Sequence, residues 1–140
     1  MAATIPIRRY NAIDLYLVYR YAQQIATVIF SKVGSVTDKI VILSTCETEA
    51  DARRIAEHLV ERRLAACVNI MPGVTSVYRW KGAVESASEW MLVIKSRSDL
   101  VAAIEREFDV VHPYEVPELV VLPIVDGGKA YLQWLSTEIG

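Results

Sequence analysis

Apolar residues recur along this chain with two different spacings, and the changes between them outline the predicted elements. Residues 40–44 form a continuous apolar run rich in β-branched side chains, which is typical of a strand buried on both faces. The stretch that follows predicts a helix, because its apolar residues lie three or four positions apart. These residues are Ala52, Ile55, Ala56, Leu59 and Val60. Thr48 or Thr45 can cap the start of this helix.

A long hairpin is predicted after this first helix. Residues 66–80 are rich in β-branched and aromatic side chains and are interrupted by Pro72-Gly73, so we predict a strand with a bulge at those two residues. Lys81-Gly82 is the predicted tip of the hairpin. The return strand is predicted over residues 90–96, because its side chains alternate between two faces. One face carries Trp90, Leu92 and Ile94, and the other carries Met91, Val93 and Lys95.

The last third of the chain predicts a second helix, a short strand and a final helix. Ser98 or Ser96 is expected to begin the second helix. The inward face of that helix is predicted to carry Leu100, Ile104, Phe108 and Val111. Residues 119–124 predict a fourth strand, and Pro123 suits an edge or a strand end because proline cannot donate a ladder hydrogen bond. A last short helix is predicted over residues 130–138.

The order of these elements predicts an α+β fold. Strand, helix, strand, strand, helix, strand is the split βαβ or ferredoxin-like plan, an antiparallel sheet with both helices on one face, here followed by a C-terminal helix. The first and second strands are not neighbours in such a sheet, so Cys46 and Cys67 are expected to remain free thiols. Two cysteines outside any metal-ligand spacing indicate a reducing, cytoplasmic location.

The first 38 residues differ from the rest of the chain. Apolar residues at helical spacing predict an amphipathic helix over residues 11–32. Arg20, Gln23 and Gln24 interrupt the apolar run, which therefore falls short of the ~20 apolar residues that a membrane span requires. We expect residues 1–38 to be a dispensable, helical N-terminal extension and residues 39–140 to form the folded domain.

Composition and charge exclude some classes of partner. The apolar fraction of 53% indicates one folded globular domain. The net charge is −2, and lysine and arginine are scattered rather than gathered in one basic tract. That pattern argues against nucleic acid as a partner.

The segment from His112 to Glu118 is the first candidate site. Pro113 and Pro117 hold an imidazole, a phenol and two carboxylates in an extended, nearly rigid stretch. A simpler interpretation is that Pro113 ends the helix and His112 lies in its last turn, where the helix dipole favours a cation. For His112 taken alone, the simpler interpretation is favoured.

A second candidate site combines a lysine with aromatic and acidic side chains. Its residues are Tyr78, Trp80, Lys95, Tyr114, Glu115 and Glu118. A lysine among aromatics can bind an anionic small molecule or pair with a glutamate across a subunit boundary. The alternative, which carries somewhat more weight, is that the aromatics form the core of a subunit interface. The sequence contains no Ser/His/Asp arrangement, no HExxH motif and no phosphate loop, so we do not expect an enzyme.

Four separated motifs resemble the CutA divalent-cation tolerance family, in the order that is typical of it. They are Leu64-Ala65-Ala66-Cys67-Val68-Asn69, Ser76-Val77-Tyr78-Arg79-Trp80-Lys81-Gly82, His112-Pro113-Tyr114-Glu115-Val116-Pro117-Glu118 and Tyr131-Leu132-Gln133-Trp134. The resemblance begins near residue 38 and implies a ferredoxin-like subunit, a homotrimer, a link to copper and other divalent metals, and no settled catalytic activity. It also implies structural kinship with PII-type signalling proteins.

The metal ligands that the resemblance implies are present only in part. Copper binding in bacterial relatives is attributed to a cysteine near the end of the first strand and to two adjacent histidines before the Pro-Tyr pair. This chain has Ser44 and Val111 at two of those positions and keeps His112, while Cys46 lies two residues beyond Ser44. We therefore expect weak and poorly selective Cu(II) binding through His112, with no cofactor required.

Three classes of function remain open from the sequence. The first is a homotrimeric protein of divalent-metal tolerance, which binds Cu(II) weakly. The second is a PII-like signalling or adaptor trimer that binds a small ligand in its intersubunit clefts. The third, rated low, is an enzyme or an RNA-binding protein built on the same plan; an RNA-recognition sheet would show paired aromatics and a basic surface.

Overall fold

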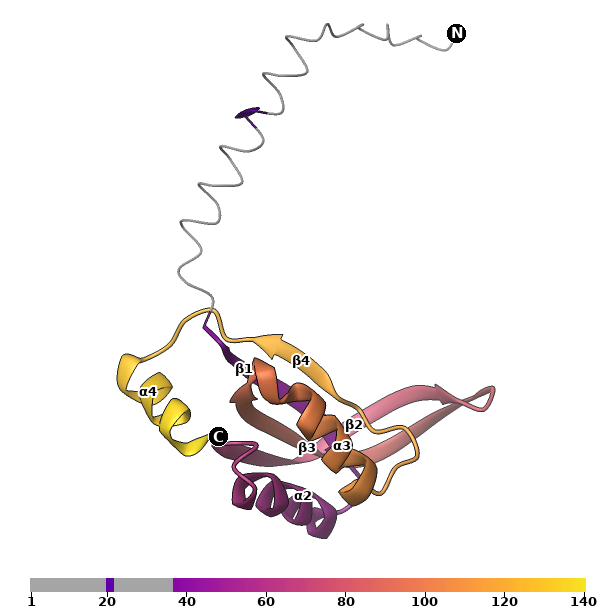
Figure 1. Cartoon of the computed structure of the whole chain (residues 1–140). Helices are drawn as coiled ribbons and strands as arrows, with labels where there is room; N and C mark the ends of the chain where they lie inside the picture. The colour runs from indigo at the N-terminus through magenta and orange to yellow at the C-terminus, as the bar shows by residue number, and fades with distance from the viewer. Residues whose placement is uncertain (1–19, 22–36) are drawn as a thin grey trace, which may run out of the picture. The chain divides into compact units, whose positions relative to one another are not determined.

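The computed structural model describes residues 20, 21 and 37–140, and residues 36–140 form one compact unit. The helix predicted over residues 11–32 lies outside the described residues apart from Arg20 and Tyr21. The elements follow the predicted order (Figure 1). They are β1 (Lys39–Cys46), α2 (Glu49–Glu61), β2 (Cys67–Trp80), β3 (Ala83–Arg97), a 3₁₀ turn (Ser98–Leu100), α3 (Val101–Val111), β4 (Val120–Pro123) and α4 (Lys129–Glu138).

The four strands form one sheet in the order β2-β3-β1-β4, with every neighbouring pair antiparallel. This order confirms the ferredoxin-like prediction. β4 is an edge strand that ends at Pro123, as its proline indicated. Cys46 and Cys67 are both free, because β3 lies between the strands that carry them. In the described part of the chain, no helix is long and apolar enough to cross a membrane.

Helices α2 and α3 cover one face of the sheet, where the main core lies (Figure 1). Alternate residues of β1 and β3 point into this core, because side chains of a strand alternate between its two faces. Ile42, Leu92 and Ile94 are fully buried there against Ile104 and Leu59 of the helices. Val60, which was predicted to face inward, is 40% exposed and lies at the margin of the helix stripe.

The starts of the two core helices differ in how they are capped. Thr48 caps α2 as predicted, since its hydroxyl accepts a hydrogen bond from the Asp51 backbone N–H at 3.1 Å. The predicted serine start of the second helix is wrong. Ser96 is buried and donates to the Leu64 carbonyl oxygen at 2.6 Å, and Ser98 opens a 3₁₀ turn that delays α3 to Val101.

β2 and β3 continue well past the end of β1 as a two-stranded ribbon, which we call the arm (residues 74–89). The predicted bulge is confirmed by a register shift between Met71 and Val74. Lys81 and Gly82 form the tip with φ values of 45° and 91°, as a tight hairpin turn requires. β3 begins at Ala83, so the return strand is longer than the 90–96 segment that its alternation predicted.

The C-terminal helix α4 is anchored by a second, smaller apolar cluster. Leu135 and Ile139 are buried against Ala66 at the edge of the domain. The Arg63 guanidinium donates to the Gly140 carbonyl oxygen at 3.2 Å and to the Thr137 carbonyl oxygen at 2.7 Å. These contacts fasten the end of the chain to the loop after α2.

Truncation of one core residue tests this packing. We expect Ile104→Ala to lower the free energy of unfolding by about 2–5 kcal/mol, because Ile104 is fully buried and the change leaves a cavity. Val110→Ala on the same helix is the matched control: Val110 is 79% exposed, so its effect should stay within about 0.5 kcal/mol. Urea unfolding of the three proteins measures both values. Equal effects at the two positions would contradict the placement of the core.

Candidate functional site

His112 is held by both of its ring nitrogens at the end of β1. Its Nε2 lies 3.1 Å from the Thr45 carbonyl oxygen, and its Nδ1 accepts the backbone N–H of Tyr114 at 3.2 Å. A carbonyl can only accept and an N–H can only donate, so the ring is neutral with its proton on Nε2. Ser44 Oγ lies 3.5 Å from the same Nε2. The imidazole therefore fastens the segment after α3 to the sheet.

A second set of contacts joins the end of α3 to the start of α2. The Arg54 guanidinium donates to the Val111 carbonyl oxygen and forms an ion pair with Asp51 at 2.6 Å. The Thr48 hydroxyl and the Arg54 guanidinium lower the pKa of the Asp51 carboxyl, since both stabilise its charged form. The carbonyl groups at the end of α3 thus find partners in a side chain of α2 and in the backbone N–H of His112.

Tyr114 extends this network to β3. Its phenol donates to Glu89 Oε1 at 2.7 Å, and Glu89 is only 4% exposed. Burial, and then the hydrogen bond to Glu89, raise the pKa of Tyr114 above its usual value, so the phenol remains a donor at neutral pH. The sequence analysis missed Glu89. The sequence feature that could have identified Glu89 is its position directly before Trp90, where the alternating apolar run of β3 begins.

Cys46 is the last residue of β1 and is fully buried. Burial, with the nearby Asp51 and Glu89 carboxylates, raises the pKa of its thiol to about 11. Its Sγ lies 3.5 Å from the Thr48 carbonyl oxygen, to which the thiol donates. Metals bind the thiolate, so this protonated thiol is a poor ligand as the chain is folded.

These residues do not fit a metal ion as they are arranged. A metal-bound imidazole needs a free nitrogen lone pair, and the single lone pair of neutral His112 accepts the Tyr114 N–H. Over residues 37–140, no group of three or more histidine, cysteine or acidic side chains is placed to hold an ion. Copper ligation by His112 stays a prediction from the family resemblance, without support from this geometry.

The residues of the second candidate site fall into three separate groups. Tyr114 joins His112 and Glu89, as described above. Lys95 is 93% buried, and its ammonium donates to Asn69 Oδ1 and to the Val93 carbonyl oxygen at 3.1 Å. The remaining residues lie on or near the arm and the exposed loop before β4; these are Tyr78, Trp80, Glu115 and Glu118. Lys81, which lies over the Trp80 ring, approaches Glu115 at 3.9 Å.

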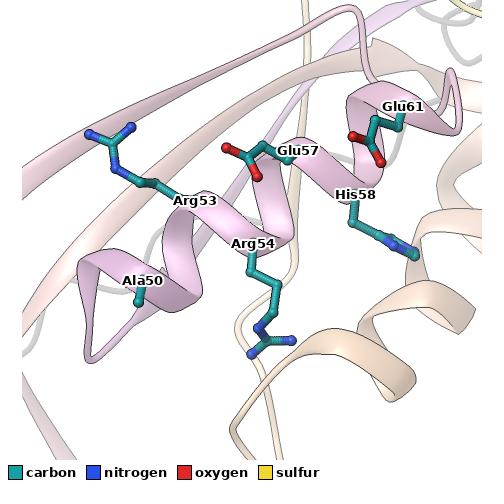
Figure 2. A pocket seen from close by; sticks show the side chains of 6 residues that line it. All are labelled: Ala50, Arg53, Arg54, Glu57, His58 and Glu61. Atoms are coloured by element: carbon teal, nitrogen blue, oxygen red, sulfur yellow. The ribbon is translucent and has the colours of Figure 1, made fainter.

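A shallow depression on the outer side of α2 is the other place where charged side chains gather, as Figure 2 shows. It is lined by Ala50, Arg53, Arg54, Glu57, His58 and Glu61. Its basic side chains already have partners within the domain: Arg53 pairs with Glu49 at 2.7 Å, Arg54 with Asp51 at 2.6 Å and His58 with Glu107 at 2.6 Å. We assign this surface to helix stabilisation and to the contact between α2 and α3.

The His112 contacts predict a pH dependence of stability. Desolvation of the half-buried ring lowers the pKa of His112 below 6.5, although the Thr45 carbonyl, Asp51 and Glu89 act in the opposite direction. The unfolded chain therefore binds a proton more readily than the folded one, so stability falls as pH drops below about 6.5. Urea unfolding at pH 7.5 and 5.5 should show a smaller difference in His112→Ala than in wild type. Val110→Ala, at an exposed position that takes no part in the ring contacts, should retain the wild-type difference, and an unchanged difference in His112→Ala would contradict the assignment.

Known proteins were compared with this chain by sequence. A family model described as CutA1 divalent ion tolerance protein matches residues 40–138. The divalent-cation tolerance protein CutA of Thermus thermophilus is 47% identical over 100 residues, which cover 71% of this chain and 97% of that protein. The human protein CutA is 48% identical over 102 residues, or 73% of this chain and 55% of that protein. The chain therefore spans about half the length of the human relative.

Solved structures agree with the sequence matches. The CutA1 structure from Thermus thermophilus has a TM-score of 0.71 at 46% identity and covers 73% of this chain and 99% of that one. CutA1 from Oryza sativa has a TM-score of 0.71 at 39% identity, with coverages of 73% and 94%. Over the same span, the four motifs, the ferredoxin-like sheet and the family model coincide. The chain belongs to the CutA1 divalent ion tolerance protein family.

Proposed function

We propose that this chain acts in divalent-cation tolerance as a cytoplasmic homotrimer, and that its function depends on the assembled subunits rather than on a copper ion bound by His112. The observation that carries the proposal is an apolar sheet face that residues 37–140 leave open. The family name supports the role in cation tolerance. The two free cysteines support a reducing compartment.

The open face is the side of the sheet opposite α2 and α3. Strand alternation and the register place on it six apolar residues of β1, β3 and β4: Val41, Leu43, Met91, Val93, Val120 and Leu122. Val120 and Leu122 are 43% and 45% exposed, whereas Ile42, Leu92 and Ile94, which face the helices, are fully buried. Apolar surface of this kind on an antiparallel sheet favours burial against another protein surface.

The arm provides a second reason for self-association. Its strands pair only with each other beyond Trp90, and isolated two-stranded ribbons are marginally stable in water. Val77 and Val84 are 69% and 65% exposed there. A second copy that packs along the arm buries these residues, and a closed ring leaves none of the arms uncovered. The family resemblance implies three subunits.

Assembly is tested by breaking the open face without disturbing the core. We expect wild type to have the mass of three chains by light scattering and Leu122→Glu to have a lower mass, because the new charge lies in the proposed interface. Val110→Glu on the outer side of α3 is the control and should keep the wild-type mass. A stable monomer in wild type would overturn the proposal.

The second candidate is a PII-like signalling or adaptor trimer that binds a small ligand between subunits. The complete hydrogen bonding of His112 favours it over a copper-binding protein, because such a role does not require the imidazole lone pair. It uses the same trimer, and its ligand site would be formed only between the assembled subunits. A screen of metabolites for stabilisation of the trimer distinguishes it from a metal-dependent role.

Calorimetry tests whether His112 binds copper. Since both ring nitrogens of His112 are engaged, we expect Cu(II) to bind wild type and His112→Ala with equal affinity, or neither protein at all. Both proteins should first be shown to have the same mass, so that assembly does not confound the result. An affinity that is lost in His112→Ala and falls as pH drops through the histidine range would restore the imidazole as a ligand.

A further inference from the structure

Two lysines lie buried on the open face, and they differ in their electrostatic partners. Lys39 is 4% exposed and forms an ion pair with Asp38 at 2.5 Å. Lys95 is 7% exposed, and its ammonium contacts only neutral oxygens, those of the Asn69 side chain and the Val93 carbonyl. Within residues 37–140, Lys95 has no carboxylate at ion-pair distance.

A buried ammonium without a counter-charge is unfavourable, because burial removes its hydration and neutral acceptors replace it incompletely. Lys95 donates toward Val93, which belongs to the apolar part of the open face that the proposed trimer buries. Assembly would remove the remaining water from the ammonium and increase the cost. The partner that compensates it therefore has to come with the surface that covers the face.

Glu118 has the properties that this partner requires. It is exposed and makes no ion pair with another described residue. Leu119 packs against the core, and Glu118 lies two residues before Val120, which begins β4 and belongs to the open face. Pro117 restricts the backbone immediately before Glu118 and so reduces the entropy that the carboxylate loses on pairing. Within one chain, β1 separates β4 from β3, about 10 Å across the sheet.

We propose that the Lys95 ammonium of one subunit pairs with the Glu118 carboxylate of a second copy of this chain. The inference rests on the proposed homotrimer and adds to it a specific contact that determines how the subunits are oriented. In a closed ring each subunit supplies one Lys95 and one Glu118, so every interface contains the same pair. The pair favours one alignment of two apolar faces that would otherwise slide over each other.

A double-mutant cycle on the full chain tests the pairing. Glu118→Gln should weaken the wild-type oligomer about thirtyfold or more, because it leaves the Lys95 ammonium buried and unpaired. In a Lys95→Met background, which keeps the length of the side chain without its charge, the same change should have no weakening effect. Subunit dissociation is followed by light scattering across a guanidinium series. Equal weakening in the two backgrounds would overturn the pairing.

Charge reversal provides the second measurement. Lys95→Glu alone and Glu118→Lys alone should each shift dissociation to lower guanidinium, and the double reversal should return it toward wild type. The matched control combines Lys95→Glu with Glu115→Lys, from the same exposed loop, and should give no recovery. Recovery in the Lys95→Glu, Glu115→Lys double variant would identify Glu115 as the partner and overturn the proposal.

Other sources of the carboxylate give different results in the same assays. Asp14 is the only acidic residue before position 37, so Asp14→Asn in place of Glu118→Gln reports a partner in that segment. If Asp14→Asn shows the non-additivity with Lys95→Met and Glu118→Gln does not, the proposal is wrong. Failure of the trimer itself appears as a monomeric wild type, whereas a wild-type trimer with additive effects rejects only the Lys95–Glu118 pair.

Discussion

Over residues 37–140, the structure depends on a sheet whose helices α2 and α3 cover one face. Because α2 and α3 bury alternate residues of β1 and β3, the other residues of the same strands must point away from the core. Those residues are still largely apolar, so one register produces both the hydrophobic core and an apolar face that the described part of the chain does not cover. Folding of the subunit and its proposed association with other copies would therefore both follow from the same strand pairing.

His112 illustrates how the local fold limits what a side chain can do. Pro113 ends α3 and turns the chain so that the Tyr114 N–H meets Nδ1, while β1 ends close enough for its Thr45 carbonyl to meet Nε2. The imidazole satisfies two backbone groups that the end of a helix and the end of a strand leave without partners. A histidine used in this way has no lone pair for an ion, even though the residue type suits copper.

The periodicity of apolar residues was sufficient to predict the fold, because each element buries one face and shows it in the sequence. It was insufficient for the site. The partner of Tyr114 is Glu89, which is distant in sequence and reaches the phenol only through the topology of the sheet. The start of α3 was misplaced because the Ser96 hydroxyl bonds to Leu64, a tertiary contact that local capping rules do not include. Likewise, nothing in the local sequence of Lys95 indicates that its ammonium is buried.

Groups that find their partners within the domain differ in role from groups that do not. Polar groups that the single chain satisfies internally, such as His112, Tyr114 and the ion pairs of α2, hold the domain together and leave little capacity for an external ligand. The groups that the chain leaves unsatisfied, the apolar sheet face and the Lys95 ammonium, lie together on the side opposite the helices. Since binding free energy comes from surfaces and charges that the free subunit exposes or compensates poorly, the proposed association uses that face. In the proposed trimer, a second copy of the chain would present a surface of the same extent and an exposed carboxylate, and so would meet both requirements at once.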